Sequence, residues 1–407
     1  MKILHTADWH LGDRMGRIDR TDDLRRAVER VADICHQEAV DVLLVAGDLF
    51  SELSRPDALR DSIEHLQATF EKFLLGGGSV VAITGNHDNE TFCQTLHLVM
   101  TLAAPTASRP GDLCPSGRFY LAANPTFLRL VERQGQQVQF LLLPYPTPPR
   151  YLQEEQTQRY ASLEEKNRHL MAAYARKVEQ FQRDPRFDPS LPTVLTAHIH
   201  VQGARLPTLF RISEEESLIF GREHMPESLA YVALGHIHQA HCPTDQRHVR
   251  YSGSIERLDL GERHDQKSLV LVEIGPEGRR GEPACVPLPA TPIYEVEITR
   301  PSEEVPRLRE RYPDADRALV RYRLVWKAGV DDREALLREL DAIFPRWYHR
   351  EVIEASRLRE AVAALPGQGA GSFRDSVLRY LEAQLEGDED RADLLGLAEA
   401  LLLEETS

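Results

Sequence analysis

The stretch KILHTADWH, residues 2–10, places an apolar run directly before an aspartate and a histidine, Asp8 and His10. Four later segments repeat this arrangement, in which a run typical of a buried strand ends at Asp, Asn or His. The five predicted strands are Lys2–Ala7, Val42–Ala46, Val80–Thr84, Thr193–Thr196 and Tyr231–Leu234. The motifs that follow them are Asp8-Trp9-His10, Gly47-Asp48, Gly85-Asn86-His87-Asp88, Ala197-His198 and Gly235-His236-Ile237-His238. Because site residues in α/β proteins gather at the carboxyl ends of strands, these motifs predict one shared site.

The residue types in these motifs are those that bind metal ions. Asp8 and His10 stand two apart on an extended chain and therefore point to one side, as does the final His-x-His pair. Asp48 can bridge two cations about 3.5–4 Å apart, and the Asn86 amide adds a ligand oxygen without a charge. Taken singly, each motif has a plainer interpretation, such as a cap, a turn or half of a structural zinc site. Five motifs in this order favour a two-metal centre that acts on phosphate esters.

The predicted elements indicate an α/β fold followed by a smaller unit. Strands alternate with helices over residues 1–100, which is typical of a parallel sheet with crossover helices. The helices expected there are Asp22–Glu38, Pro56–Leu75 and Thr91–Leu102. Further elements are strands at Val138–Leu143 and Ser268–Ile274 and a polar helical insert over Leu152–Gln182. The glycines and prolines of Gly275–Pro292 predict a domain boundary.

Beyond that boundary we expect a small mixed unit and then a tail. The unit contains predicted strands at Tyr294–Ile298 and Leu319–Trp326 and a helix at Asp332–Phe344. The segment Leu365–Ser372 has the composition of a flexible linker, and two amphipathic patterns follow it. Two short helices cannot bury both apolar stripes against each other. Either they pack on the rest of this chain or, as we prefer, they dock on a helix of a partner protein.

Charge and cysteine content narrow the class of protein. The formal net charge of −15 argues against nucleic-acid binding, but the tail from Glu351 onward holds thirteen acidic and five basic residues and carries −8 of it. Arginines near the first motif form either a strip for phosphate contacts or an ordinary solvated helix face: Arg14, Arg17, Arg20, Arg25, Arg26 and Arg30. The five cysteines contain no C-x-x-C pair, and no apolar stretch suits a signal peptide or a membrane span. We therefore expect a cytoplasmic protein with reduced thiols and no membrane partner.

The ordered set D-x-H, GD, GNHD, H and GHxH resembles the calcineurin-like metallophosphoesterase superfamily. Longer segments are similar to the bacterial SbcD family, the nuclease subunits of SbcC–SbcD complexes that process double-strand breaks: Lys2–Gly12, Ala46–Phe50 and Tyr251–Arg257. The resemblance implies a two-sheet α/β sandwich flanked by helices, with a small α+β capping domain and a helical C-terminal tail. We expect these parts at residues 1–285, 290–350 and 351–407.

The resemblance also implies a role for each ligand-type residue. One metal ion would be held by Asp8, His10, Asp48 and His238, and a second by Asp48, Asn86, His198 and His236. His87 would be the catalytic histidine that binds no metal, and His200 a supporting or surface residue. Archaeal relatives often carry a histidine where this chain has Ser51, so any substrate role of that histidine is absent here or filled elsewhere.

Cofactors and partners follow from the same resemblance. The family implies two Mn²⁺ ions, and the mixed oxygen and imidazole ligands also accept Fe²⁺ or Zn²⁺. Activated water would attack phosphorus in line, while a protonated His87 stabilises the developing charge or protonates the leaving oxygen. The implied partners are double-stranded DNA ends, an SbcC-like coiled-coil ATPase held by the C-terminal helices, and a second copy of the chain. Candidate DNA contacts are Arg14, Arg17 and Arg257; candidate dimer residues are Leu59, Ile63, Leu66, Phe92, Leu96 and Val99.

Three functions are compatible with these motifs. A Mn-dependent DNA exonuclease and endonuclease uses every predicted part of the chain. A metallophosphodiesterase acting on small nucleotides keeps the chemistry but has no evident use for a capping unit and tethered helices. A DNA-end scaffold without activity would not need a complete set of metal ligands. The sequence therefore favours the nuclease.

Overall fold

The computed structural model describes residues 1–51, 56–103, 113–152, 160–205, 218–221, 225 and 227–356, together with 391, 394 and 395. The chain divides into two compact units, Met1–Tyr294 and Glu295–Ser407. No helix in the described part of the chain has the length and apolar character needed to span a bilayer. The amphipathic tail patterns predicted beyond Leu365 lie outside the described residues, apart from three single positions.

The first unit contains a six-stranded sheet with the order β15-β14-β1-β4-β5-β6. Four of its strands run parallel: β1 (Lys2–Thr6), β4 (Val42–Ala46), β5 (Ser79–Ile83) and β6 (Phe119–Ala122). Two more strands extend the sheet: β14 (Ser268–Gly275) pairs antiparallel with β1, and β15 (Gly278–Pro287) pairs antiparallel with β14. The parallel strands end at the same edge, which brings the first three motifs together.

A second sheet of five strands has the order β13-β12-β9-β8-β7. β7 pairs antiparallel with β8, and the remaining pairs are parallel. The strands are β7 (Thr126–Val131), β8 (Gln137–Leu143), β9 (Thr193–His198), β12 (Tyr231–Gly235) and β13 (Val249–Tyr251). This sheet carries the fourth and fifth motifs at the ends of β9 and β12. Its strand order could not be obtained from sequence alone.

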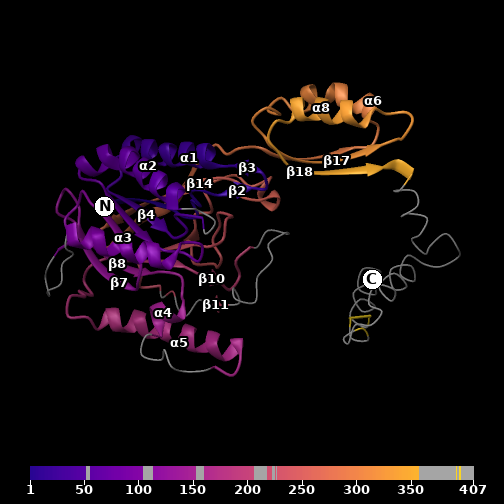
Figure 1. Cartoon of the computed structure of the whole chain (residues 1–407). Coiled ribbons are helices and arrows are strands. Elements are labelled where there is room, and N and C mark those ends of the chain that lie inside the picture. The colour runs from indigo at the N-terminus through magenta and orange to yellow at the C-terminus, as the bar shows by residue number, and fades with distance from the viewer. Residues whose placement is uncertain are drawn as a thin grey trace. The chain divides into compact units, whose positions relative to one another are not determined.

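The two sheets pack face to face with helices outside them. Alternate residues of β4 show this: Val42 and Leu44 join a core shared with Phe140 and Val194 of the second sheet, whereas Leu43 faces the helices. Figure 1 shows α1 and α2 along one side of this unit and α4 and α5 along the opposite side. The helices are α1 (Thr21–Gln37), α2 (Pro56–Leu75), α3 (Glu90–Ala103), α4 (Pro148–Tyr151) and α5 (Leu163–Gln182). The predicted two-sheet α/β sandwich is therefore confirmed.

Two segments differ from the expectation. The glycine- and proline-rich segment Gly275–Pro292 contains the ten-residue strand β15, because prolines are tolerated on a sheet edge. The helix expected from Leu152 begins only at Leu163, where the Ser162 side chain accepts a hydrogen bond from the Glu165 N–H at 3.1 Å.

The apolar stripes considered for a dimer mostly serve the core. Leu59 and Leu66 are buried, and Ile63, Phe92 and Leu96 pack against the same cluster. The Val99 side chain is 57% exposed, and its neighbours on α3 are also exposed, Leu98 at 67% and Leu102 at 84%. Only this outer part of α3 remains available to a second chain among the residues considered.

The second unit is built on the three-stranded sheet β16-β17-β18. Its strands are β16 (Ile293–Ile298), β17 (Leu319–Trp326) and β18 (Trp347–Glu354), and β17 runs parallel to β18. Its helices are α6 (Pro301–Glu304), α7 (Leu308–Arg311) and α8 (Arg333–Ile343). Buried Leu340 and Phe344 at the end of α8 accompany buried Tyr322 and Leu324 of β17. The strands and the helix predicted for this unit all form.

Candidate metal centre

The five motifs meet at one place in the first unit. β1, β4 and β5 bring the first three from one sheet, and β9 and β12 bring the other two from the second sheet. Backbone hydrogen bonds join the first two motifs directly: Trp9 N–H donates to Asp48 O at 2.8 Å, and His10 N–H donates to the same oxygen at 3.0 Å. The backbone N–H of His236 donates to the Asp8 carboxylate at 3.1 Å, which links the two sheets.

Backbone strain is concentrated at this place. Asp8, His10, Asp48 and His236 have φ angles of 54°, 47°, 52° and 95°, values that side chains rarely adopt. Among the described residues, the only other non-glycine with a positive φ is Ala39. Strained backbone costs about 1–3 kcal/mol a residue and persists where the surrounding structure imposes it, most often at functional sites.

One group of ligand atoms comes from Asp8, His10 and His238, which lie within 4.8 Å of one another. Burial lowers the pKa of His10 to about 3, so its ring is neutral near pH 7. Its Nε2 atom is buried without a hydrogen-bond partner and lies 3.6 Å from Asp48 Oδ2. A neutral imidazole nitrogen left without a donor has a lone pair available for a cation.

A second group comes from Asp48, Asn86, His198 and His236. His198 Nε2 lies 3.1 Å from Asp48 Oδ2 and 2.9 Å from Asn86 Oδ1. His236 Nδ1 lies 3.0 Å from the same Asn86 oxygen. Nδ1 of His198 faces Ala46 O at 2.8 Å and donates to it, so in a neutral ring the Nε2 lone pair would face the lone pairs of two oxygen acceptors. Such lone pairs repel one another unless a proton or a cation lies among them.

The charges of these groups favour a cation at both positions. Although burial favours the neutral ring, the Asp48 carboxylate raises the pKa of His198 to about 9. Burial opposes protonation of His238 too, but Glu262 raises its pKa to about 9. Burial would raise the pKa of Asp48, yet the neighbouring histidines hold it well below its usual range. Each ring therefore attracts positive charge, and a divalent cation can take the place of the proton.

Two glycines make this close approach possible. A Cβ atom on Gly85 would overlap Asp48 Oδ1. Gly47 has φ +98°, and a Cβ there would overlap the Nδ1 atom of His198. The glycines of the second and third motifs are therefore required for the ligands to meet.

His87 lies beside these groups, and its backbone N–H is bound to one of them. Its N–H donates to Asp48 Oδ1 at 2.9 Å, and its half-buried ring has its centroid 4.9 Å from that of His10. Asp88 holds the same loop by accepting hydrogen bonds from Gly85 N–H at 2.8 Å and Phe50 N–H at 2.9 Å. Burial raises the pKa of Asp88 to about 6.

Sequence reasoning missed the residues that support His238. Glu262 is fully buried, and its Oε1 accepts from His238 Nδ1 at 2.8 Å. The buried Lys267 ammonium contacts Glu262 Oε2 and donates to His238 O at 3.0 Å. Burial would raise the pKa of Glu262, but His238 and Lys267 lower it to about 2. No local motif marks these residues, because they approach His238 only through the fold.

The residues considered for DNA contact have different surroundings. The hairpin of β2 (Arg14–Met15) and β3 (Ile18–Asp19) presents Arg14 and Arg17, which are exposed. Arg257 is instead held by backbone oxygens, donating to Asp265 O at 2.9 Å and Thr291 O at 3.0 Å. Contact of Arg257 with DNA stays a prediction.

One further arginine of the predicted strip, Arg20, has a structural role. Arg20 is fully buried, and its Nε lies 2.8 Å from Asp23 Oδ2 while its Nη2 lies 3.3 Å from Glu256 Oε2. Ser51, which stands where archaeal relatives often carry a histidine, is buried, and its hydroxyl faces Asp13 Oδ1 at 3.4 Å. His200, in the short strand β10 (His200–Val201), is buried too.

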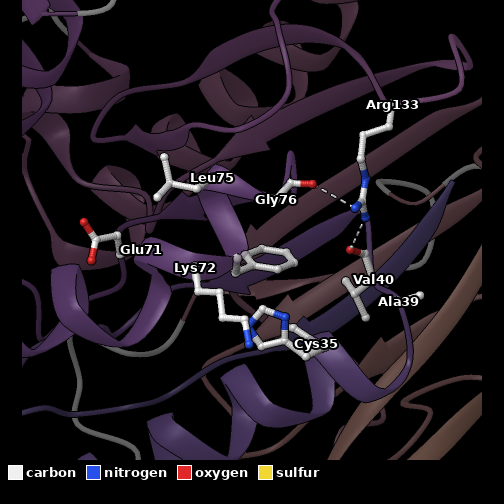
Figure 2. Close-up of a pocket in the computed structure, with 10 residues that line it drawn as sticks. Cys35, Ala39, Val40, Glu71, Lys72, Leu75, Gly76 and Arg133 are labelled. Atoms are coloured by element: carbon white, nitrogen blue, oxygen red, sulfur yellow. Dashed lines mark hydrogen bonds between the residues drawn. The ribbon is translucent and has the colours of Figure 1, made fainter.

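A separate cavity of about 590 Å³ lies at the ends of α1 and α2. Figure 2 shows Arg133 in its wall, where the guanidinium donates to Gly76 O at 2.9 Å and Val40 O at 3.2 Å. None of the motif residues lines this cavity, so it does not belong to the metal centre.

Comparison with known proteins agrees with this geometry. The model of the family "Calcineurin-like phosphoesterase" matches residues 1–240. The chain belongs to this family. Members of the calcineurin-like phosphoesterases hold divalent metal ions, and the unpartnered His10 nitrogen and the mixed nitrogen and oxygen donors described above suit such ions.

Among curated relatives, the chain is 28% identical over 279 residues to the SbcD subunit of the nuclease SbcCD of Escherichia coli (strain K12). The match covers 67% of this chain and 64% of that protein, so it spans somewhat less than two thirds of the relative's length. The SbcD subunit of Bacillus subtilis (strain 168) is 29% identical over 285 residues, which is 68% of this chain and 67% of the relative. A solved dimetal phosphatase from Danio rerio is 11% identical with a TM-score of 0.41, covering 71% of this chain and 99% of that structure.

Proposed function

We propose that this protein is a metal-dependent nuclease that hydrolyses phosphodiester bonds of DNA at a two-metal centre. The observation that carries the proposal is the position of Asp48, whose Oδ2 faces His10 Nε2 at 3.6 Å and His198 Nε2 at 3.1 Å. A carboxylate oxygen between two groups of ligands suits a bridge between two cations. The assignment of ligands is the one that the sequence suggests: Asp8, His10, Asp48 and His238 for one ion, and Asp48, Asn86, His198 and His236 for the other.

The chemistry divides between the ions and the protein. Bound divalent cations neutralise phosphate charge and make a water molecule acidic enough to attack near neutral pH. The strained backbone at Asp8, His10 and Asp48 holds the ligating atoms in place before substrate arrives. His87 lies at the edge of this arrangement and, as a proton donor, protonates the leaving oxygen or stabilises charge on it.

Support for DNA as the substrate comes from the relatives, which are named as subunits of the nuclease SbcCD. We infer that two Mn²⁺ ions serve the site, and that the chain acts as exonuclease and endonuclease on double-stranded ends during break processing in the cytoplasm. Exposed Arg14 and Arg17 are placed to meet the phosphate backbone. Residues 1–285 would act as the nuclease domain and residues 290–350 as the capping domain.

The same proposal includes two protein partners. An SbcC-like coiled-coil ATPase would bind the amphipathic helices of residues 351–407, whose predicted apolar stripes need a partner. A second copy of this chain would pack against the exposed part of α3, where Leu98, Val99 and Leu102 present apolar side chains.

The experiment is Mn²⁺-dependent cleavage of a blunt, end-labelled DNA duplex, with a cyclic nucleotide as the competing substrate. His87→Ala should lower duplex cleavage by roughly 10²–10⁴ while both metal ions stay bound, as measured by metal analysis of the purified protein. His65→Ala on α2 is the matched control and should cleave like the wild type.

Turnover of the cyclic nucleotide with intact DNA would instead show a small-substrate phosphodiesterase. Loss of the metal ions in His87→Ala would contradict the separate role given to His87. A chain without activity on either substrate, alone and with the ATPase partner, would contradict the enzyme itself.

A further inference from the structure

A cavity of about 540 Å³ opens directly beside the metal centre. Asn86 and His87 line it on one side, and the segment after β8 and the first turns of α5 line it on the other. Its volume is in the range that ligand pockets occupy in proteins. A substrate that reaches the metal ions through His87 therefore has room to extend into this cavity.

A buried arginine in the wall lacks a full set of acceptors. The Arg150 side chain is only 1% exposed, and its Nη1 donates a hydrogen bond to Tyr145 O at 2.9 Å. Its Nε has no hydrogen-bond partner among the described residues and lies 3.9 Å from Glu90 Oε1. An unsatisfied buried donor on a charged group is costly, so this position favours a ligand that brings an acceptor oxygen.

A lysine supplies a second positive charge. Lys166, in the first turns of α5, makes no hydrogen bond or ion pair through its ammonium to any described residue. The two acids in the wall are already engaged: Glu90 accepts from Gln94 Nε2 at 3.1 Å, and Asp88 accepts from backbone N–H groups. Among the described residues, neither acid of the wall neutralises the lysine, so its charge favours an anionic ligand beside Arg150.

The remaining wall suits a nucleoside. The Tyr145 ring lies between the metal centre and the cavity, with its centroid 5.9 Å from that of His236. Leu170 and Pro148 add apolar surface. An aromatic ring beside apolar side chains can stack on a nucleic-acid base, and such stacking does not depend on which base is bound.

We propose that this cavity is a nucleotide subsite, in which Lys166 and Arg150 bind the phosphate of the nucleotide next to the bond that is cut. The inference rests on the proposed function, since it assigns the cavity to the nucleic-acid strand whose cleavage we propose at the metal ions. Tyr145 and Leu170 contact the base or sugar of that nucleotide. The subsite gives the strand a second attachment point and orients the reacting phosphate.

Calorimetric titration of the full-length, Mn²⁺-loaded chain with deoxyadenosine 5′-monophosphate tests the subsite without relying on activity. The wild type should bind the nucleotide, and Lys166→Ala should raise the dissociation constant roughly tenfold because one charge-assisted phosphate contact is lost. Lys166→Arg should keep most of the affinity. Arg168→Ala removes an exposed charge from the same helix and should bind like the wild type.

Hydrolysis of bis(p-nitrophenyl) phosphate, which is too small to need the cavity, separates the two claims. It should proceed in the wild type and, within about twofold of that rate, in the control Arg168→Ala. Unchanged nucleotide affinity in Lys166→Ala, or an equal loss in Arg168→Ala, would overturn the subsite even if hydrolysis is normal. Absent hydrolysis by the wild type would contradict the proposed function, while the titration would still decide the subsite. Absence of nucleotide binding by the wild type would overturn the subsite.

Discussion

Replacing Glu262 with glutamine removes one negative charge from a fully buried network and leaves the shape of the side chain nearly unchanged. Glu262 contacts His238 Nδ1 at 2.8 Å and the Lys267 ammonium, and accepts from Ser254 Oγ at 3.1 Å. Despite burial, which acts in the opposite direction, His238 and Lys267 lower the pKa of Glu262 from 4.5 to about 2. At about 1.4 kcal/mol for each unit of pKa, this lowering of the Glu262 pKa corresponds to about 3 kcal/mol of folding free energy.

We therefore expect Glu262→Gln to lower the free energy of unfolding by about 3–5 kcal/mol, because it leaves the Lys267 charge buried and poorly paired. It should also weaken metal binding by roughly 10–100-fold, because the carboxylate orients His238 and raises its basicity. Urea unfolding in the presence of a chelator measures the change in stability, and Mn²⁺ titration of the folded protein measures the change in metal affinity. Glu273→Gln, at an exposed ion pair, is the control and should change neither.

The double variant Glu262→Gln, Lys267→Met separates the two effects. It should recover part of the lost stability, since the buried Lys267 ammonium is removed together with the Glu262 carboxylate, although Asp265 then loses its contact with Lys267. It should not recover the metal affinity. The stability effect should also depend on pH. Glu262 contributes fully above its unfolded pKa of 4.5, so the difference from the wild type should shrink as the pH falls from 5 toward 3. Wild-type metal affinity in Glu262→Gln would refute the role given to this carboxylate.

Three further results follow from the structure. Arg20→Met should lower the free energy of unfolding by about 3–5 kcal/mol in urea titrations, because it removes a buried ion-pair partner from both Asp23 and Glu256, whereas Arg14→Ala at an exposed site should change it by less than about 0.5 kcal/mol. Gly85→Ala should lose Mn²⁺ binding in equilibrium dialysis, since the new methyl group overlaps the Asp48 carboxylate; retained binding would show that the loop can shift. Mn²⁺ at about 100 times its dissociation constant should stabilise the chain by about 2.7 kcal/mol over chelator in denaturant titrations, and no difference would argue against a preformed site.

Many strands and helices were predictable because local sequence patterns mark their bounds. β4 has the predicted bounds Val42–Ala46, and α2 has the predicted bounds Pro56–Leu75, where proline begins the helix and glycines follow it. The strand β15 was not predicted, because its pairing with β14 is decided by the sheet edge and not by its composition. The start of α5 was misplaced because a polar surface segment carries little periodicity.

The amino-acid sequence by itself determined which side chains gather at the strand ends, since each proposed ligand follows a strand whose apolar residues require burial at the sheet. Only the tertiary structure decided how those side chains are supported and what lies beside them. Glu262 meets His238 across a loop, and Lys166 shares a cavity with His87 from a distant helix. Contacts between residues far apart in the chain depend on how the two sheets pack, and no local pattern records that packing.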